Sequence, residues 1–192
     1  MNARQPAPAK PGTLVCVVGP SGAGKDTLID AARRHFSADP RFAFPQRLIT
    51  RTGQIGESHR PLARPNDEKS QPQGAFLLSW AAHGEVYAIP IEVLGQLEAG
   101  HVVVVNVSRS VIAEAHAAWP KLAVFHVTAP PDVLQGRLLA RGREDEDAIA
   151  QRLARAPALV LPAGIALEEI DNGGSLADAE ACFIASLKRL AD

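Results

Sequence analysis

The sequence predicts an α/β fold with a mainly parallel central sheet. Continuous apolar runs of strand length are typical of strands buried on both faces, and helix-length segments separate these runs. A chain of 192 residues with 46% apolar residues is long enough for one domain with its own core. The net charge of −1 argues against binding to nucleic acid or to an anionic membrane.

Four apolar runs are expected to form the strands of this sheet. The pattern is clearest in Val102–Val107, where five of the six residues are valine. The other expected strands are Leu14–Val18, Ala123–Val127 and the weaker run Ile165–Ile170. Crossover helices between consecutive strands favour parallel pairing.

Helices are expected between these strands. In the first of them, apolar residues recur at helical spacing, so that Leu28, Ile29 and Ala32 share one face. Three of the later helices begin beside residues that favour helix starts, namely Pro131, Asp145 and Ser175. The expected helices are Asp26–Phe36, Arg109–Trp119, Asp132–Arg141, Asp147–Ala156 and Leu176–Leu190.

Domain organisation follows from the composition along the chain. Residues 1–12 are biased toward Pro and Ala without an apolar run, and we expect a disordered N-terminal lead before a single domain over residues 13–192. Residues 41–73 interrupt the alternation of strands and helices and are expected to be an inserted lobe or a long functional loop. Cys16 and Cys182 lie in apolar runs and are interpreted as buried thiols. No apolar stretch is as long as a membrane span, so a cytoplasmic protein is expected.

A phosphate-binding loop follows the first expected strand. GPSGAGKDT has the spacing Gly-four-Gly-Lys and stands between a buried strand and a helix. Its glycines allow successive backbone N–H groups to point into one concavity, and the helix N-terminus adds partial positive charge. The residues expected to bind ATP are Gly19, Pro20, Ser21, Gly22, Ala23, Gly24, Lys25, Asp26 and Thr27.

The residue after the loop lysine departs from the usual pattern. A Ser or Thr hydroxyl normally binds Mg²⁺ there, whereas this chain has Asp26, followed by Thr27. A carboxylate is also a suitable ligand for a hard cation. Mg²⁺ is therefore expected as a cofactor, with either Asp26 or Thr27 as its ligand.

Further motifs extend the pattern over nearly the whole chain from Leu14. They are ITR at Ile49–Arg51, FLLSWAAHGEVYAIP from Phe76, GHVVVVNVS from Gly100, LLARGRE from Leu138, RLARA at Arg152–Ala156 and IDNGGSL near the end. In this order they resemble the guanylate kinases. The resemblance implies a three-layer P-loop fold, an acceptor-binding insert over 41–90 and a helical lid over 137–152. It also implies that Lys25 and the lid residues Arg137, Arg141 and Arg152 act on the transferring phosphoryl group.

Several departures from the guanylate kinases argue against GMP as the acceptor. Gln54 stands where the family has a second acceptor arginine, and Ser79 replaces the glutamate that reads guanine. Asn106 and Ser108 replace an acidic pair. A site built for guanine loses specificity when its base-reading carboxylate is missing.

The chain resembles the ribose 1,5-bisphosphate phosphokinases, relatives of the guanylate kinases associated with phosphonate catabolism, more closely. The shared features are Asp26 after the loop lysine, LSW at 78–80, VN-x-SR at 105–109, RGRE at 141–144 and DNGGSL at 171–176. The resemblance implies transfer of the ATP γ-phosphoryl group to the 1-phosphate of ribose 1,5-bisphosphate, which forms 5-phospho-α-D-ribose 1-diphosphate (PRPP). A small phosphorylated sugar is thus the expected partner, and no oligomeric state is predicted.

The residue types fit an acceptor with two phosphate groups and no base. Residues 41–64 contain five arginines, Arg41, Arg47, Arg51, Arg60 and Arg64, and a single acid. The attacking phosphate oxygen is already largely ionised at neutral pH, so no general base is required. The residues expected to bind the acceptor are Arg51, His59, Ser79, Tyr87 and Asn106.

Two alternative functions stay open from the sequence. A nucleoside monophosphate kinase with altered base choice would have the same fold and the same donor. A non-catalytic guanylate-kinase-like binding module is disfavoured, because the phosphate loop and the lid arginines are present.

Overall fold

The central sheet of the molecule contains five parallel strands in the order β2-β7-β1-β8-β9. The computed structural model describes residues 10–50, 59–61 (backbone only), 74–82, 84–140, 142, 149 and 159–192. In the middle of the sheet, Cys16 of β1 pairs with Val105 of β7 and Val124 of β8. The strands are β1 (Thr13–Val18), β2 (Phe42–Ala43), β7 (Val102–Asn106), β8 (Leu122–Thr128) and β9 (Ala166–Asp171).

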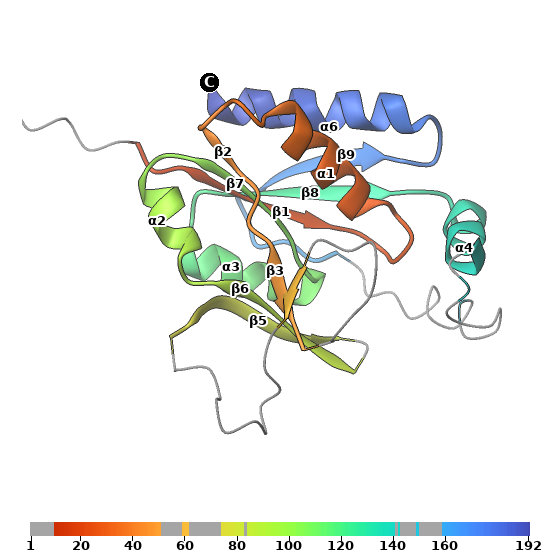
Figure 1. Ribbon diagram of the computed structural model, residues 1–192, viewed down its shortest axis with the longest axis horizontal. Coiled ribbons are helices and arrows are strands. Elements are labelled where there is room, and N and C mark those ends of the chain that lie inside the picture. The colour runs from red at the N-terminus through yellow and green to blue at the C-terminus, as the bar shows by residue number, and fades with distance from the viewer. Residues whose placement is uncertain are drawn as a thin grey trace, which may run out of the picture.

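Helices cover both faces of this sheet, which makes the fold three-layered (Figure 1). On one face, α1 (Lys25–His35) and α6 (Leu176–Ala191) pack on the inward side chains of β1 and β8. The other face is covered by α2 (Val93–Glu98), the 3₁₀ turn η1 (Arg109–Val111), α3 (Ile112–Ala118) and the inserted sheet. The helix α4 (Pro131–Ala140) follows β8 at the carboxyl ends of the strands. The α/β fold class is confirmed.

The strands and helices predicted for the core are found within about two residues of their expected bounds. The apolar runs form strands because the alternate residues of β1, β7 and β8 enter two separate buried clusters, one on each face. The expected helix start at Ser175 is confirmed, since its hydroxyl accepts a hydrogen bond from Asp178 N–H at 3.4 Å. The expected helix Asp147–Ala156 lies almost wholly outside the described residues.

The insert forms a second sheet in the order β4-β3-β6-β5. Its strands are β3 (Arg47–Ile49), β4 (His59–Pro61), β5 (Phe76–Ala82) and β6 (Glu85–Pro90). The expected boundary at residue 41 falls too early, because Phe42–Ala43 is a strand of the central sheet. A strand of only two residues has no recognisable sequence pattern, so the pairing of β2 with β7 could not be predicted from the sequence.

Three smaller expectations have mixed outcomes. Cys16 is buried as expected, but Cys182 is exposed, because it lies on the outer side of the amphipathic helix α6. Of the expected N-terminal lead, residues 1–9 lie outside the described chain, whereas Gly12 donates a hydrogen bond to Leu97 O at 2.7 Å. Among the described helices, none has the length and apolar character to cross a membrane.

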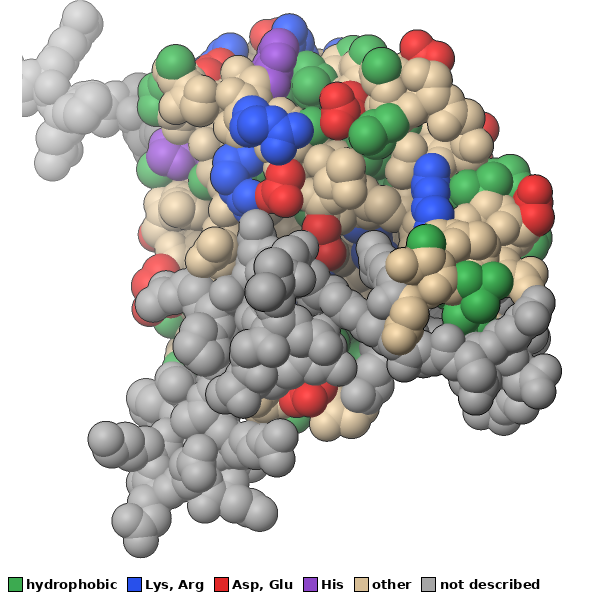
Figure 2. Space-filling model, turned by 45° about the vertical axis from the view of Figure 1, so that its right-hand side comes forward, with side chains coloured by type: hydrophobic (Ala, Val, Ile, Leu, Met, Phe, Trp, Pro, Cys, Tyr) green, Lys and Arg blue, Asp and Glu red, His purple; other side chains and the backbone are tan. Residues whose placement is uncertain are grey.

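Charges of both signs lie close together on the described surface. On the face seen in Figure 2, Lys and Arg side chains are interspersed with Asp and Glu side chains.

Candidate functional site

The phosphate loop joins the carboxyl end of β1 to α1. Gly24 has a φ of 89°, and a Cβ atom there would come within 2.3 Å of Asn172 Nδ2. At Gly19, a Cβ atom would come within 2.2 Å of Val127 O. Both glycines are therefore required by close approach of neighbouring groups, as well as by backbone conformation.

Lys25 lies across this loop. Its Nζ donates hydrogen bonds to Gly19 O at 2.8 Å and to Pro20 O at 2.9 Å. The ammonium group is thus held over the loop, where it could exchange these carbonyls for phosphate oxygens. Of the other residues expected to bind ATP, Gly22 and Ala23 are buried, while Pro20 and Ser21 are half-buried.

Asp26, in the first turn of α1, joins the loop to two other elements. Its Oδ1 accepts a hydrogen bond from Asn106 Nδ2 at 2.6 Å, and its Oδ2 lies 3.5 Å from Arg47 Nη2. Asn106 ends β7 and is buried, so the structure brings this predicted acceptor residue beside the loop. Ser108 instead caps η1, where its hydroxyl accepts from Ser110 N–H at 3.3 Å.

The oxygen donors at this point suit a hard cation. The Asp26 carboxylate belongs to the ligand class that Mg²⁺ prefers, and Asn106 turns its amide nitrogen toward that carboxylate. Thr27 is exposed on α1. No cluster of three or more His, Cys, Asp or Glu side chains suited to a metal occurs in the described part of the chain. A bound Mg²⁺ would thus depend mainly on Asp26 and on the phosphates of the nucleotide.

The inner face of the inserted sheet carries an aromatic stack. Trp80 and Tyr87 pair across β5 and β6 with their ring centroids 5.5 Å apart and nearly parallel, and the Arg47 guanidinium lies 5.3 Å from the Tyr87 centroid. Ser79 is exposed and precedes Trp80 in the same strand, so its side chain points to the opposite face of the sheet. The structure therefore brings Tyr87 and Arg47 together and does not bring Ser79 to them.

Arg137 and Asn172 support the phosphate loop from the side of α4 and β9. Arg137 donates from Nη2 to Asn172 O at 2.8 Å and from Nη1 to Gly22 O at 3.4 Å. Asn172 donates from Nδ2 to Ala23 O at 2.7 Å. Its Oδ1 is buried and has no hydrogen-bond partner within the described residues. Arg137 and Asn172 thus both contact the backbone of the phosphate loop. Asn172 belongs to the motif DNGGSL, but the sequence alone did not predict this contact.

A second network of polar contacts lies toward the carboxyl ends of β8 and β9. Arg109 Nη2 lies 3.3 Å from His126 Nε2, and His126 Nδ1 lies 3.6 Å from Glu169 Oε1. Burial lowers the pKa of His126, the charges of Arg109 and Lys25 lower it further, and Glu169 opposes them. Burial also lowers the pKa of Arg109. The sequence analysis did not predict this network, although a histidine inside the apolar run of β8 indicated a polar contact there.

Some predicted site residues lie where the structure describes little or nothing. Arg51, Arg141 and Arg152 are outside the described residues. His59 is described by its backbone alone, which pairs with Arg47 in β3. Their assignments stay predictions.

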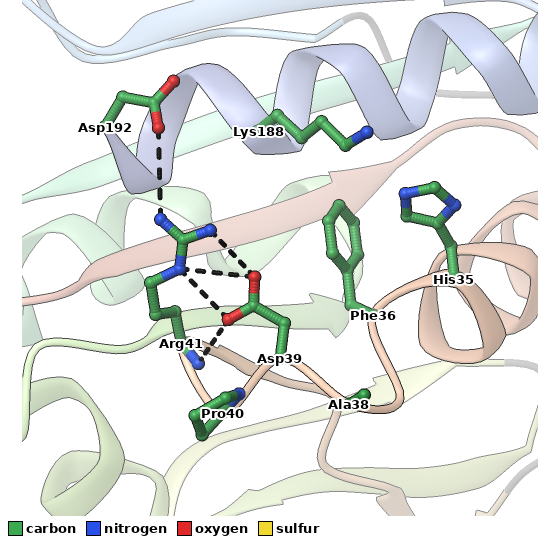
Figure 3. Close-up of a pocket in the computed structure, with 8 residues that line it drawn as sticks. All are labelled: His35, Phe36, Ala38, Asp39, Pro40, Arg41, Lys188 and Asp192. Atoms are coloured by element: carbon green, nitrogen blue, oxygen red, sulfur yellow. Dashed lines mark hydrogen bonds and ion pairs between the residues drawn. The ribbon is translucent and has the colours of Figure 1, made fainter.

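Arg41 lies near the amino ends of the central strands, away from the phosphate loop. The residue after it, Phe42, pairs with Val102 at the amino end of β7, whereas the loop lies at the carboxyl ends. Arg41 donates to Asp39 Oδ2 at 2.8 Å and lies 4.0 Å from Asp192, beside a cavity of about 530 Å³ (Figure 3). Arg41, counted above among the arginines of residues 41–64, thus lies away from the phosphate loop, because the strand that follows it, β2, belongs to the central sheet.

Known proteins resemble this chain in sequence and in fold. A family model described as an AAA domain matches residues 15–156. The ribose 1,5-bisphosphate phosphokinase PhnN of Rhizobium etli is 46% identical over 185 residues, which is 96% of this chain and 93% of that protein. The protein of the same name from Burkholderia mallei is 45% identical over 93% of this chain and 96% of its own.

Among solved structures, a guanylate kinase from Anaplasma phagocytophilum has a similar fold. It superposes with a TM-score of 0.64 over 95% of this chain and 86% of its own, at 12% sequence identity. At that identity the likeness concerns the fold alone. It supports the guanylate-kinase-like arrangement of the core.

Proposed function

The chain belongs to the ribose 1,5-bisphosphate phosphokinase family, and we propose that it transfers the γ-phosphoryl group of ATP to the 1-phosphate of ribose 1,5-bisphosphate. The products would be ADP and PRPP. The observation that carries this proposal is the phosphate loop with Lys25, set beside a cationic group, Arg47, on the inner face of the insert. This arrangement supports a donor site at the loop and an adjoining acceptor site on the insert.

Lys25 and the loop N–H groups would bind the phosphates of ATP. The Lys25 ammonium donates hydrogen bonds to two loop carbonyls, Gly19 O and Pro20 O. Phosphate oxygens are stronger partners for an ammonium than carbonyl oxygens, because the bond gains from charge on both sides. Nucleotide binding would therefore draw Nζ away from the loop carbonyls onto the β- and γ-phosphates.

The nucleophile needs no general base. The attacking atom would be an oxygen of the 1-phosphate, which is ionised at neutral pH, and the barrier then arises mainly from charge repulsion between acceptor and donor. This agrees with the amide of Asn106 at a position where alcohol phosphorylation would favour a carboxylate. Catalysis would rest on positioning and on neutralising charge.

Mg²⁺ fits the oxygen donors beside the loop, and Asp26 would be its protein ligand, with Thr27 as the alternative. When bound, the cation supplies positive charge to the β- and γ-phosphate oxygens. Asn106 would hold the Asp26 carboxylate in a fixed orientation through Oδ1.

The remaining charge compensation is assigned to arginines. Arg137 would hold the loop through Gly22 O, while Arg141 and Arg152 of the lid would act on the transferring phosphoryl group. The acceptor would be bound by Arg51, with His59 as a further contact. Tyr87 would orient Arg47 through ring stacking.

An acceptor screen tests the proposal. Purified protein with Mg²⁺ and ATP would be given ribose 1,5-bisphosphate, ribose 5-phosphate, GMP or AMP, and ADP release would be measured by a coupled assay. Turnover with ribose 1,5-bisphosphate and a far lower kcat/KM for the nucleotides is expected. Strong turnover with GMP and none with ribose 1,5-bisphosphate would instead assign the chain to the nucleoside monophosphate kinases.

A further inference from the structure

Arg47 bridges the inserted sheet and the phosphate loop. On the basis of the proposed function, we infer that Arg47 binds the acceptor, and that its ion pair with Asp26 keeps it from the acceptor until the donor binds. Binding of the metal–nucleotide donor at Asp26 would release Arg47 to the acceptor phosphate. Donor and acceptor binding would then be coupled through one ion pair.

The position of Arg47 suits this role. It begins β3, its side chain is only 15% exposed, and its guanidinium lies over the Tyr87 ring at 5.3 Å. The antiparallel pairing of Ile49 with Tyr87 puts both residues and Arg47 on the same face of the inserted sheet. The guanidinium therefore lies between the sheet and the loop, where an acceptor phosphate must approach the donor.

Asp26 has two oxygens with different partners. Oδ1 accepts a short hydrogen bond from Asn106, whereas Oδ2 faces Arg47 at the longer distance of 3.5 Å. The Arg47 contact is thus the looser of the two. A divalent cation on this carboxylate would compete for the same negative charge and repel the guanidinium. Release of Arg47 is the expected consequence.

The released guanidinium suits a phosphate. Its planar fork of N–H groups matches two phosphate oxygens, and the face of Tyr87 keeps the plane of the fork in register. Arg47 also lies over the Tyr87 ring, an aromatic surface on which a purine base could otherwise stack. The same residue would therefore favour a base-free, doubly phosphorylated acceptor and disfavour a nucleotide.

Coupling of this kind is reciprocal. If the donor makes the acceptor bind more tightly by some factor, the acceptor must strengthen donor binding by the same factor. A coupling of about 10-fold is expected, within the usual range for two linked sites.

Calorimetry with the full chain tests the inference. The dissociation constant of ribose 1,5-bisphosphate would be measured with and without the non-hydrolysable donor Mg²⁺–AMP-PNP, for the wild type and for Arg47→Met, Asp26→Asn and the exposed control Arg34→Met. Arg47→Met should weaken acceptor binding about 10- to 100-fold, as expected for loss of a charge-assisted bond, and should abolish the coupling. Asp26→Asn should bind the acceptor tightly even without donor. Arg34→Met should behave as the wild type.

Tryptophan emission gives a readout that needs no acceptor. Trp80 stacks on the ring that Arg47 covers, so Mg²⁺–AMP-PNP alone should change its emission. The change should be lost in Trp80→Phe and in Arg47→Met. Acceptor binding by Arg47→Met equal to the wild type, or an emission change that persists in Arg47→Met, would overturn the inference.

The two proposals fail in different ways. If the wild type does not bind ribose 1,5-bisphosphate at all, the proposed function fails, and the emission change still decides whether Asp26 releases Arg47. If the wild type binds and converts this acceptor but Arg47→Met behaves as the wild type, only the role of Arg47 fails.

Discussion

Lys25 is the residue on which the proposed transfer depends most directly. Its Nζ donates to two backbone carbonyls of the phosphate loop, Gly19 O and Pro20 O, and Lys25 does not belong to either buried apolar cluster, so Lys25→Ala should leave the core intact. Lys25→Ala should lower kcat by at least about 10²–10³-fold, the usual loss for one charge-stabilising donor. Steady-state assays and circular dichroism would be compared with those of Lys188→Ala, which removes an exposed lysine of α6 beside the cavity near Arg41. Near-wild-type turnover of Lys25→Ala would refute the role.

Asn172 connects β9 to the phosphate loop through a buried hydrogen bond to Ala23 O. Asn172→Ala leaves that carbonyl without its donor, and a loss of about 1–3 kcal/mol in the free energy of unfolding is expected. Urea denaturation followed by circular dichroism measures this loss. Nucleotide affinity should fall as well, since the loop loses its brace. Unchanged stability together with unchanged affinity would remove Asn172 from the site.

His126 makes the stability depend on pH. Its folded-state pKa is lowered below the unfolded value, so the unfolded chain binds more protons as the pH falls through about 6.5. Stability contributed by the neutral imidazole is therefore present above this range and is lost on acidification. His126→Gln should lose less stability between pH 7 and pH 5 than the wild type, with His35→Gln as the exposed control. An equal loss of stability in the wild type and in His126→Gln would contradict the lowered pKa of His126.

Among the elements, α6 has a defined cap that can be tested alone. Ser175 lies in extended conformation before the helix, and its hydroxyl accepts from Asp178 N–H. Ser175→Ala should lower the free energy of unfolding by about 0.5–2 kcal/mol. Ser37→Ala, an exposed serine in the turn after α1, is the matched control and should leave stability unchanged. An equal effect of the two substitutions would show that the cap contributes nothing.

The elements that the sequence predicted are those with a continuous apolar signal. β1, β7 and β8 are buried on both faces, so their apolar runs, which are rich in Val, are recognisable without a structure. The inserted sheet was expected only as a lobe, because β3 and β4 are three residues each and β5 alternates buried and exposed positions irregularly around a bulge. Such strands are specified by their pairing partners.

For the whole molecule, the local motifs located the site and the long-range contacts refined it. Spacing within GPSGAGKDT sufficed to assign Lys25 and the loop. The pairing of Asp26 with Asn106, 80 positions later, and with Arg47 across the insert depends on how β1, β7 and β3 come together. No periodicity encodes these contacts. Arg41 shows the converse, since a local excess of arginine included a residue that belongs to another edge of the sheet.

The central claim concerns the whole molecule, namely that a guanylate-kinase-like core phosphorylates a sugar phosphate. Phosphorus NMR of the products formed from ATP, Mg²⁺ and ribose 1,5-bisphosphate tests it most directly. Stoichiometric ADP and a new pair of coupled diphosphate resonances on the pentose, with the 5-phosphate resonance retained, are predicted. Consumption of ATP without a pentose diphosphate, or no reaction under conditions in which GMP is phosphorylated, would contradict the claim.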